Sequence, residues 1–326
     1  MKISKLIVLL LGISILFFCF GCDEDEDVNE FEVMTDYMVA NDMDLPDLVV
    51  DWITSAEAVF TAGPENYFIL DFRTGDKNEN GTIDFEEGHI AGAHKVALVD
   101  VVDYVDTNYE GTDPILLVCY SGQTVGFANI ALRLSGYTNV MNLKFAMSGW
   151  HSDFDVWTAS TGNASLDFSS GWDDSAPPAL PSNGFPTLDT GEEDGATILA
   201  ARVDAMLAGG FLGLSGASVL ENYADYNVIN YWVEADWTLY GHVTGAYQVA
   251  PGTLGIDAGL GVVDPAGVNV TYCWTGQTSS LVTAWLTVLG YDASSLKFGV
   301  NSTIYDNLAA AKQWSASMDY AYETGP

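Results

Sequence analysis

Two stretches of the chain repeat the same order of apolar and polar positions. The apolar run PILLV leads into Cys119, a small polar loop follows, and apolar residues at helical spacing then extend over 124–137. In the same way GVNVTY leads into Cys273 and a second periodic stretch over 278–291. Short apolar runs are typical of buried strands, and periodic ones of helices. Each stretch therefore predicts a strand, a cysteine loop and a helix that ends at Gly-Tyr, a plausible helix C-cap.

The similarity between the two stretches extends beyond the cysteines. GHIAGAHKV pairs with GHVTGAYQV, CYSGQT with CWTGQT, and LSGYTNVMNLKFAM with VLGYDASSLKFGV. His89 precedes Cys119 by 30 positions, and His242 precedes Cys273 by 31. Agreement in both order and spacing indicates a duplicated unit. Because strands alternate with helices, the predicted fold class is α/β, with two domains that are each a parallel sheet flanked by helices.

The N-terminus has the pattern of an export signal. Lys2 and Lys5 precede an apolar run, 6–20, which is too short for a comfortable membrane span. Gly21 stands directly before Cys22, so this segment resembles the lipobox of bacterial lipoproteins, in which the cysteine is lipidated. We therefore expect an exported protein of the cell envelope, lipid-anchored through Cys22 to a bacterial membrane on its periplasmic or surface face. An ordinary cleaved signal peptide is the alternative, since Cys19 replaces the usual aliphatic residue.

The composition of the chain excludes one class of partner and indicates where its segments begin and end. The chain has 45 acidic and 10 basic residues, a formal net charge of −35. A polyphosphate would be repelled over most of such a surface, so no nucleic acid is expected as a partner. An acidic run follows Cys22, and a stretch rich in Ser, Gly, Pro and Asp separates the two repeats. The expected segments are a signal at 1–21, a tether at 22–35, a first domain at 36–158, a linker at 159–195 and a second domain at 196–326.

The cysteine loops place a thiol where a strand turns directly into a helix. Converging backbone N–H groups and the helix N-terminus stabilise an anion at such a point. They can lower a thiol pKa from about 8.5 to roughly 3.5–7.5. Gly122 and Gly276 let the backbone curl, and Thr124 and Thr278 can donate hydroxyl hydrogen bonds where the helix begins. The loop therefore suits a nucleophilic thiolate, or a thiolate that carries a second sulfur.

Taken together, the motifs resemble the tandem rhodanese family of sulfurtransferases. The shared features are the C-x-x-G-x-T loops, G-H-I-x-G-A, the D-x-R formed by Asp71 and Arg73, and the Gly-Tyr pairs, within about residues 40–155 and 200–310. The resemblance implies five-stranded parallel sheets and no organic cofactor. It also implies that Cys119 and Cys273 take sulfane sulfur from a small donor, hold it as a persulfide and pass it to a thiophilic acceptor. The expected substrate-binding residues are Tyr120, Ser121, Gly122, Gln123, Thr124, Trp274, Thr275, Gly276, Gln277, Thr278 and Arg73.

The chain departs from the family pattern in three ways. Both halves keep the cysteine, whereas many two-domain members have lost it in the N-terminal copy. The second half has Asn230, Tyr231 and Trp232 where the first has D-x-R. Neither loop contains the Lys or Arg that thiosulfate-specific members often use to hold the sulfonate. This last departure favours an organic persulfide or polysulfide over thiosulfate as the donor.

Other interpretations of the same residues compete with sulfur transfer. A phosphatase of a related fold would need a loop one residue longer that ends in Arg to clamp phosphate, and neither loop has it. The two cysteines could instead form one disulfide, or the chain could be a non-catalytic binding or scaffold module at the cell surface. His89 and His242 are expected to bond locally and Arg73 to pair with a carboxylate. Tyr120 and Trp274 either line the pocket mouth or cover the loop.

An insertion in the first half carries a separate motif. Residues 76–87, DKNENGTIDFEE, fit the calcium loop D-x-[DN]-x-[DN]-G-x5-E at every specified position and resemble an EF-hand loop. Oxygen ligands around a sharp turn suit Ca²⁺. No flanking helix pair is evident, so we expect a structural clip near the first cysteine; an acidic surface turn is the alternative. By the resemblance, the ligands are the side chains of Asp76, Asn78, Asn80, Asp84 and Glu87 and the carbonyl of Thr82.

Overall fold

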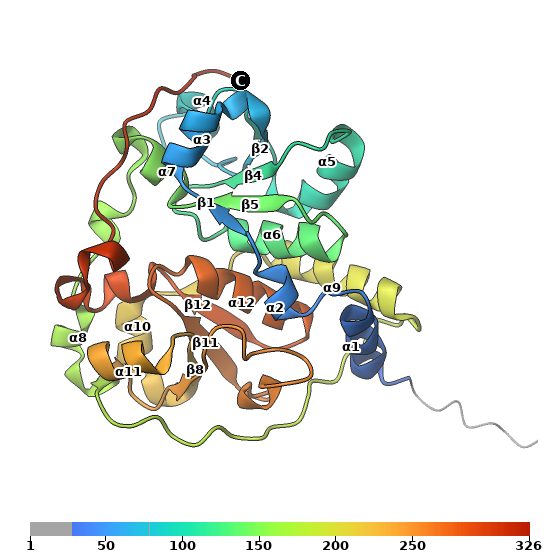
Figure 1. Cartoon of the computed structure of the whole chain (residues 1–326), viewed down its shortest axis with the longest axis vertical. Helices are drawn as coiled ribbons and strands as arrows, with labels where there is room; N and C mark the ends of the chain where they lie inside the picture. The colour runs from blue at the N-terminus through green and yellow to red at the C-terminus, as the bar shows by residue number, and fades with distance from the viewer. Residues whose placement is uncertain (1–27, 78) are drawn as a thin grey trace, which may run out of the picture.

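The computed structural model describes residues 28–77 and 79–326, and within them the chain forms two parallel sheets. One sheet lies in the upper half of Figure 1 and the other in the lower half. The expected signal segment 1–21, Cys22 and Asn78 lie outside the described residues. Within the described residues, no helix is both long and apolar enough to span a membrane.

The first sheet has five parallel strands in the order β1-β5-β4-β2-β3. Helices α3 and α7 lie on one side of it and α6 on the other (Figure 1). The strands are β1 (Ile53–Thr54), β2 (Phe68–Asp71), β3 (His94–Lys95), β4 (Ile115–Val118) and β5 (Val140–Leu143). The helices are α2 (Leu45–Leu48), α3 (Ala56–Ala62), α4 (Asp84–Glu87), α5 (Val101–Asn108), α6 (Val125–Leu134) and α7 (Ala146–Trp150).

The second sheet repeats this topology, in the order β7-β12-β11-β8-β10. Each strand takes the place of its counterpart in the first sheet, which confirms the predicted α/β class with two parallel sheets. The strands are β7 (Gly213–Leu214), β8 (Tyr226–Asn230), β10 (Tyr247–Gln248), β11 (Val268–Tyr272) and β12 (Ala293–Leu296). The helices are α10 (Gly216–Glu221), α11 (Glu234–Tyr240) and α12 (Gln277–Val288).

Local sequence explains the central element of each repeat. All four side chains of β4 are buried, as expected for the middle strand of a sheet covered on both sides. Both following helices end in the predicted Gly-Tyr cap. Gly136 and Gly290 adopt φ of 96° and 97°, and the next tyrosine N–H reaches back to the Leu132 or Leu286 carbonyl at 3.0 Å. These are Schellman caps, which need the left-handed conformation that glycine adopts without strain.

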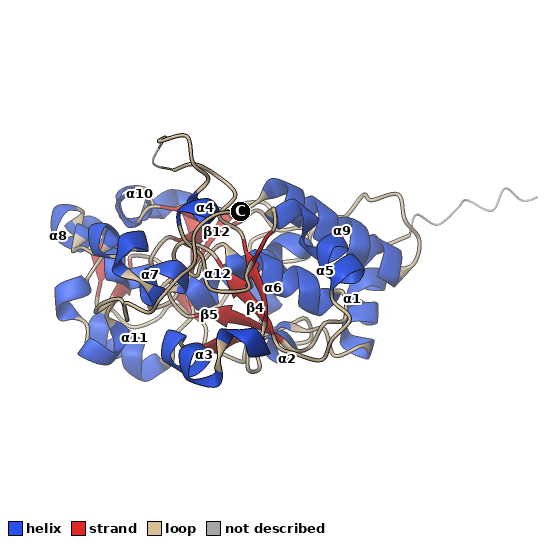
Figure 2. Cartoon of the chain, turned by 90° about the horizontal axis from the view of Figure 1, so that it is seen from above, coloured by secondary structure: helices blue, strands red, loops and turns tan. Residues whose placement is uncertain are grey.

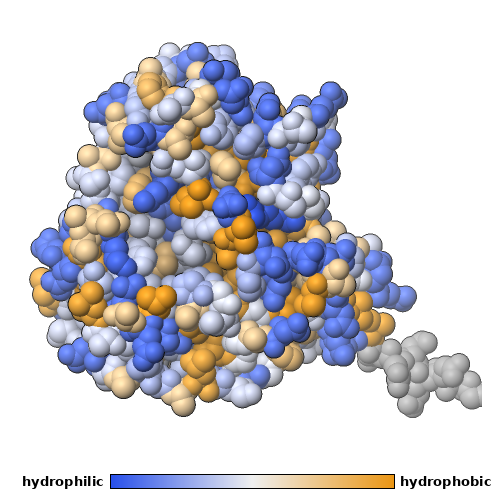
Figure 3. Space-filling view, in the orientation of Figure 1, coloured by the Kyte–Doolittle hydropathy of each residue, from blue (hydrophilic) through white to orange (hydrophobic). Residues whose placement is uncertain are grey.

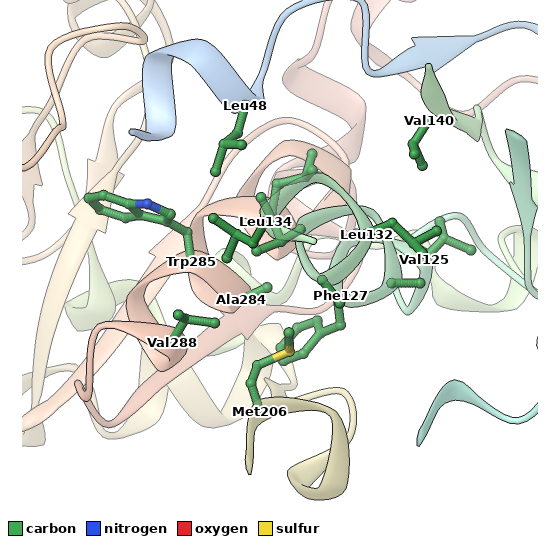
Figure 4. Packing of buried hydrophobic residues seen from close by; sticks show 14 of the residues in the cluster. Leu48, Val125, Phe127, Leu132, Leu134, Val140, Met206, Ala284, Trp285 and Val288 are labelled. Atoms are coloured by element: carbon green, nitrogen blue, oxygen red, sulfur yellow. The ribbon is translucent and has the colours of Figure 1, made fainter. Parts of the chain in front are cut away.

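The two halves share one continuous core where α6 packs against α12. Their backbones come very close, because a Cβ added at Gly126 would lie 2.1 Å from the Ser280 hydroxyl oxygen. Figure 4 shows Leu134 of α6 above Ala284 of α12, and Met206 of α9 (Gly195–Gly209) against Phe127. On the face shown in Figure 3, apolar side chains appear along the junction of the two halves, with hydrophilic ones over much of the rest.

The acidic tether expected at 22–35 is shorter than predicted. Residues 30–35 belong to helix α1 (Glu30–Ala40), which packs against α9. Phe31, Met34 and Met38 recur at helical spacing and are buried. Burial of these three side chains outweighs the repulsion between the flanking acidic residues, which alone favours an extended chain.

The segments between and after the repeats pack onto the two halves. In the expected linker, α8 (Ala164–Asp167) is followed by β6 (Trp172–Asp173), which pairs antiparallel with β9 (His242–Val243) of the second half. The final residues return to the first half, along the left edge of Figure 1. There Glu323 exchanges backbone hydrogen bonds with His89, at 2.8 and 2.9 Å, and Ala321 accepts one from the Trp150 indole.

Candidate active site

Both cysteines lie directly after the central strand of their sheet and before the helix at the junction. The Cys119 sulfur accepts the Gly122 N–H at 3.2 Å, and the Cys273 sulfur accepts the Ser279 N–H at 3.4 Å. Their exposed fractions are 2 % and 3 %. Both are free, which contradicts the disulfide interpretation.

The expected lowering of the thiol pKa is wrong for the first loop. Burial raises the pKa of Cys119, and the backbone N–H groups of Val125, Ser121 and Gly122 offset only part of that effect. Removing a thiolate from water costs more than the loop amides return. The expected backbone N–H groups therefore surround the Cys119 sulfur, but they do not outweigh the effect of its burial.

Residues of the first loop are tied to neighbouring segments. The Tyr120 hydroxyl donates to the Asp84 carboxylate, so it contacts the insertion. The Trp157 indole donates to the Ser121 carbonyl at 3.0 Å. Thr124 stands at the N-cap of α6, its backbone is already helical, and its side chain makes no capping hydrogen bond.

Arg73 pairs with a carboxylate, as its sequence context suggested. Its Nε and Nη2 donate to the two Asp71 oxygens at 3.0 and 2.6 Å, and both side chains are fully buried. Nη2 also donates to the Gly88 carbonyl at 2.6 Å. Next to it, His89 Nδ1 lies 2.9 Å from the Phe85 carbonyl. Arg73 therefore holds the Gly-His segment against the end of β2.

Aromatic rings take the place of this ion pair in the second half. Trp232 occupies the position of Arg73 and stacks on Trp274, the residue after Cys273, with ring centroids 4.0 Å apart. Tyr240 meets Trp274 edge-on at 5.2 Å. The Lys312 ammonium lies 3.4 Å from the Trp274 ring centroid and also pairs with Asp236 at 2.9 Å.

A cavity lies beside each loop, and the two differ in charge. The first, of about 140 Å³, has Arg73 and Lys77 on its wall with Tyr120, but also four carboxylates: Asp84, Glu87, Asp153 and Asp155. The second is about 190 Å³ and its described wall has no carboxylate. Its lining is Trp52, Ile53, Lys144, Phe145, Trp274, Thr275, Gln277, Thr278, Ala311, Lys312 and Gln313.

Sequence reasoning missed the lysines of these cavities. Lys77, Lys144 and Lys312 lie outside both cysteine loops, so a search of the loops alone finds no cation. The repeated Leu-Lys-Phe triplet that includes Lys144 was a signal for one of them. Nothing in the repeat pointed to Lys312.

The loop glutamines point across the junction. Gln123 and Gln277 are buried, and each accepts a backbone N–H of the opposite half. Their amide groups donate to the loop hydroxyls of Ser121 and Thr275, both at 3.0 Å. Gly122 and Gly276 have φ of 84° and 73°, the left-handed conformation expected of them. The two cysteine loops thus face each other, which the repeat alone does not imply.

The insertion is a loop that projects from the body of the molecule next to α4 (Figure 2). It is wound around Asp76, whose carboxylate accepts the N–H groups of Asn80 and Gly81 at 3.1 and 2.7 Å. Asp84 accepts the Lys77 N–H as well as the Tyr120 hydroxyl. Among the described residues, no three His, Cys, Asp or Glu side chains form a group suited to a metal ion.

Residues 56–153 match the Rhodanese-like domain family. A thiosulfate sulfurtransferase from Pseudomonas aeruginosa is 17 % identical, with 90 % of this chain and 50 % of that one covered and a TM-score of 0.29. The chain thus spans half the length of that protein. The 3-mercaptopyruvate sulfotransferase SseA from Escherichia coli is 14 % identical, with 76 % and 98 % covered and a TM-score of 0.29. A comparison with curated proteins finds no match.

Proposed function

We propose that the chain is a sulfurtransferase in which Cys119 and Cys273 each carry sulfane sulfur as a persulfide. The observation that carries this proposal is the repeated placement of a free cysteine between a central strand and a helix. A backbone N–H group donates to each sulfur, from Gly122 of the first loop and from Ser279 in the first turn of α12. The match of the first half to the rhodanese-like domain supports it.

The chemistry has two displacements at sulfur. The cysteine thiolate attacks the outer sulfur of the donor, the donor S–S bond breaks, and its electron pair leaves with sulfite when the donor is thiosulfate. An acceptor thiolate or cyanide then attacks the outer sulfur of the persulfide, and the cysteine leaves as a thiolate. The backbone N–H groups that donate to each sulfur stabilise its anionic form in both steps.

The lysines change which donor is favoured at the second loop. Lys144 and Lys312 line its cavity, and Lys312 also pairs with Asp236. Lys144 can hold an anionic group there, so a small anion such as thiosulfate fits this site. The four carboxylates beside the first loop disfavour the same ligand there. An organic persulfide remains the better donor for Cys119.

A non-catalytic scaffold module is the competing function, and the burial of both thiols favours it. Mass spectrometry after exposure to thiosulfate or glutathione persulfide separates the two. A sulfurtransferase gains the mass of one sulfur on Cys119 or Cys273 and loses it when cyanide is added. Each Cys→Ser variant should lose the label at its own site only. Absence of the added sulfur from both cysteines with both donors contradicts sulfur transfer.

We also propose that residues 76–87 bind Ca²⁺ through the side chains of Asp76, Asn78, Asn80, Asp84 and Glu87 and the Thr82 carbonyl. The Asn80 and Gly81 N–H groups donate to the Asp76 carboxylate, so the loop already turns around the first proposed ligand, which supports this site. Asn80 and Glu87 contact each other in this structure, so both would have to turn. Millimolar Ca²⁺ should raise the Tm of the protein and leave that of Asp76→Ala unchanged. Equal melting curves with and without Ca²⁺ count against the site.

Export and lipid anchoring through Cys22 are likewise proposed, on the sequence of the N-terminal segment. Metabolic labelling with a fatty-acid analogue tests them in a bacterial host. The label should enter the full chain and be absent from Cys22→Ser. Secretion of an unlabelled chain would instead indicate an ordinary signal peptide.

A further inference from the structure

Two hydrogen bonds cross the junction in a reciprocal arrangement. Gln277 of the second loop accepts the N–H of Phe145 in the first half at 2.8 Å. Gln123 of the first loop accepts the N–H of Phe298 in the second half at 2.7 Å. Each glutamine oxygen also lies against the opposite loop glycine, because a Cβ added at Gly122 or Gly276 would meet it at 2.5 Å.

The residues that donate these bonds are in an unfavourable conformation. Phe145 and Phe298 have φ of 61° and 63°, in the left-handed region that a bulky side chain rarely adopts. Such residues cost about 1–3 kcal/mol and persist only when their surroundings hold them. In the aromatic cluster around them, Trp157 meets both rings edge-on at 5.0 Å. The glutamine fixes the backbone N–H, and the cluster fixes the ring.

Each turn supports the cysteine of its own half. After Phe145, the Met147 N–H donates to the Cys119 carbonyl at 3.1 Å. After Phe298, the Val300 N–H donates to the Cys273 carbonyl at 3.2 Å. A continuous set of contacts therefore runs from each loop glutamine, through a strained turn, to the cysteine of the other half.

We propose that Gln123 and Gln277 are positioning residues that act across the junction, so that each loop controls the conformation and reactivity of the opposite cysteine. Loss of the Gln277 bond frees the Phe145 turn and, through it, the backbone of Cys119. Loss of the Gln123 bond frees the Phe298 turn and the backbone of Cys273. Binding that moves one loop is thereby communicated to the other. Thiol reactivity alone reports this coupling, so it does not depend on sulfur transfer.

The test measures alkylation of each cysteine by iodoacetamide, resolved by mass spectrometry, in the full folded chain. Gln→Met removes the acceptor and keeps the side-chain length. One lost hydrogen bond corresponds to about threefold to tenfold in loop opening. Gln277→Met should speed the alkylation of Cys119 by that factor and that of Cys273 by less than twofold. Gln123→Met should show the reverse.

A rescue variant, a control variant and an amide-exchange measurement separate coupling across the junction from general loosening of the fold. Gln277→Glu retains an acceptor oxygen and should restore the slow rate at Cys119. Gln248→Met, a matched change in the second half away from the junction, should not alter Cys119. Amide hydrogen exchange should quicken at Phe145 in Gln277→Met while Phe298 keeps its protection. Equal acceleration at both cysteines, or a change confined to the cysteine of the mutated loop, overturns the proposal.

Discussion

The two cysteine loops follow the same strand–loop–helix order and have different neighbours. Beside Cys119 lie a buried ion pair, Arg73 with Asp71, and a cavity wall with four carboxylates. Beside Cys273 lie a stack of Trp232 on Trp274 and a wall with two lysines. The strand–loop–helix unit fixes where the sulfur lies, whereas the residues packed around it fix which ligands can approach. The two halves therefore share the first property and differ in the second.

The difference in charge between the two cavity walls matters for donor binding, because cations are scarce in this chain. In a chain with a net charge of −35, most of the surface repels an anionic donor. The second cavity is a local exception to that repulsion, because its wall has two lysines, one of them paired with Asp236, and no carboxylate among its described residues. We therefore expect the two sites to differ in donor more than in the chemistry of the thiol.

We expect the largest difference between the two sites when the Arg73–Asp71 ion pair is broken. Arg73→Met leaves Asp71 buried without its partner, which should cost about 3–5 kcal/mol in the free energy of unfolding, measured by urea denaturation. The double variant Asp71→Leu/Arg73→Met should recover much of that loss, since two apolar side chains leave no buried charge. A small effect of the single change would mean that the pair is not what holds the first site.

The pH dependence of Cys119 provides the next test. Because burial raises its pKa, the alkylation rate of Cys119 in Cys273→Ser should still climb about tenfold per pH unit above pH 8.5, where an ordinary thiol levels off. The stability that this thiol contributes is fully present below its unfolded pKa. It is lost as pH rises through the folded pKa. A plateau in the alkylation rate below pH 8 would contradict the raised pKa.

The lysines should give a smaller, salt-dependent effect. Lys144→Met/Lys312→Met should raise the thiosulfate KM for reaction at Cys273 by about threefold to tenfold at low ionic strength, in steady-state assays of the Cys119→Ser background. The effect should shrink at high salt because these charges are partly exposed. Lys95→Met removes a cation outside both cavities and serves as the control. Equal KM changes in the two proteins would remove the case for a specific anion site.

The smallest expected effect concerns the second Gly-His segment. Burial lowers the pKa of His242, and the charges of Asp173 and Asp174 oppose this only partly. Below about pH 6.5 the unfolded chain therefore binds a proton at His242 and the folded chain does not. The free energy of unfolding falls as the pH drops through this range. His242→Phe keeps a ring against Trp237, which stacks on His242 at 3.5 Å, and should flatten this loss between pH 7 and 5 in thermal melts. An unchanged slope would exclude His242 as its source.

The sequence was informative wherever the signal was local. The spacing of landmarks around His89 and His242 was enough to predict two α/β units, and the Gly-Tyr pairs marked the ends of α6 and α12. The Arg73 carboxylate pair followed from its position after a strand. The raised pKa of Cys119 could not be predicted, because it comes from burial, and burial depends on the tertiary packing around the thiol.

By itself the sequence determined two copies of a strand, a cysteine loop and a helix, since hydrophobic periodicity and glycine placement act within a few residues. Only the tertiary structure decided that the loops face each other, that Gln123 and Gln277 bond across the junction, and that Lys312 covers Trp274. These contacts join residues more than a hundred positions apart, or bring in a segment outside the repeat. They depend on how the two units dock, which is set by packing over the whole α6–α12 surface, and no local pattern encodes that geometry.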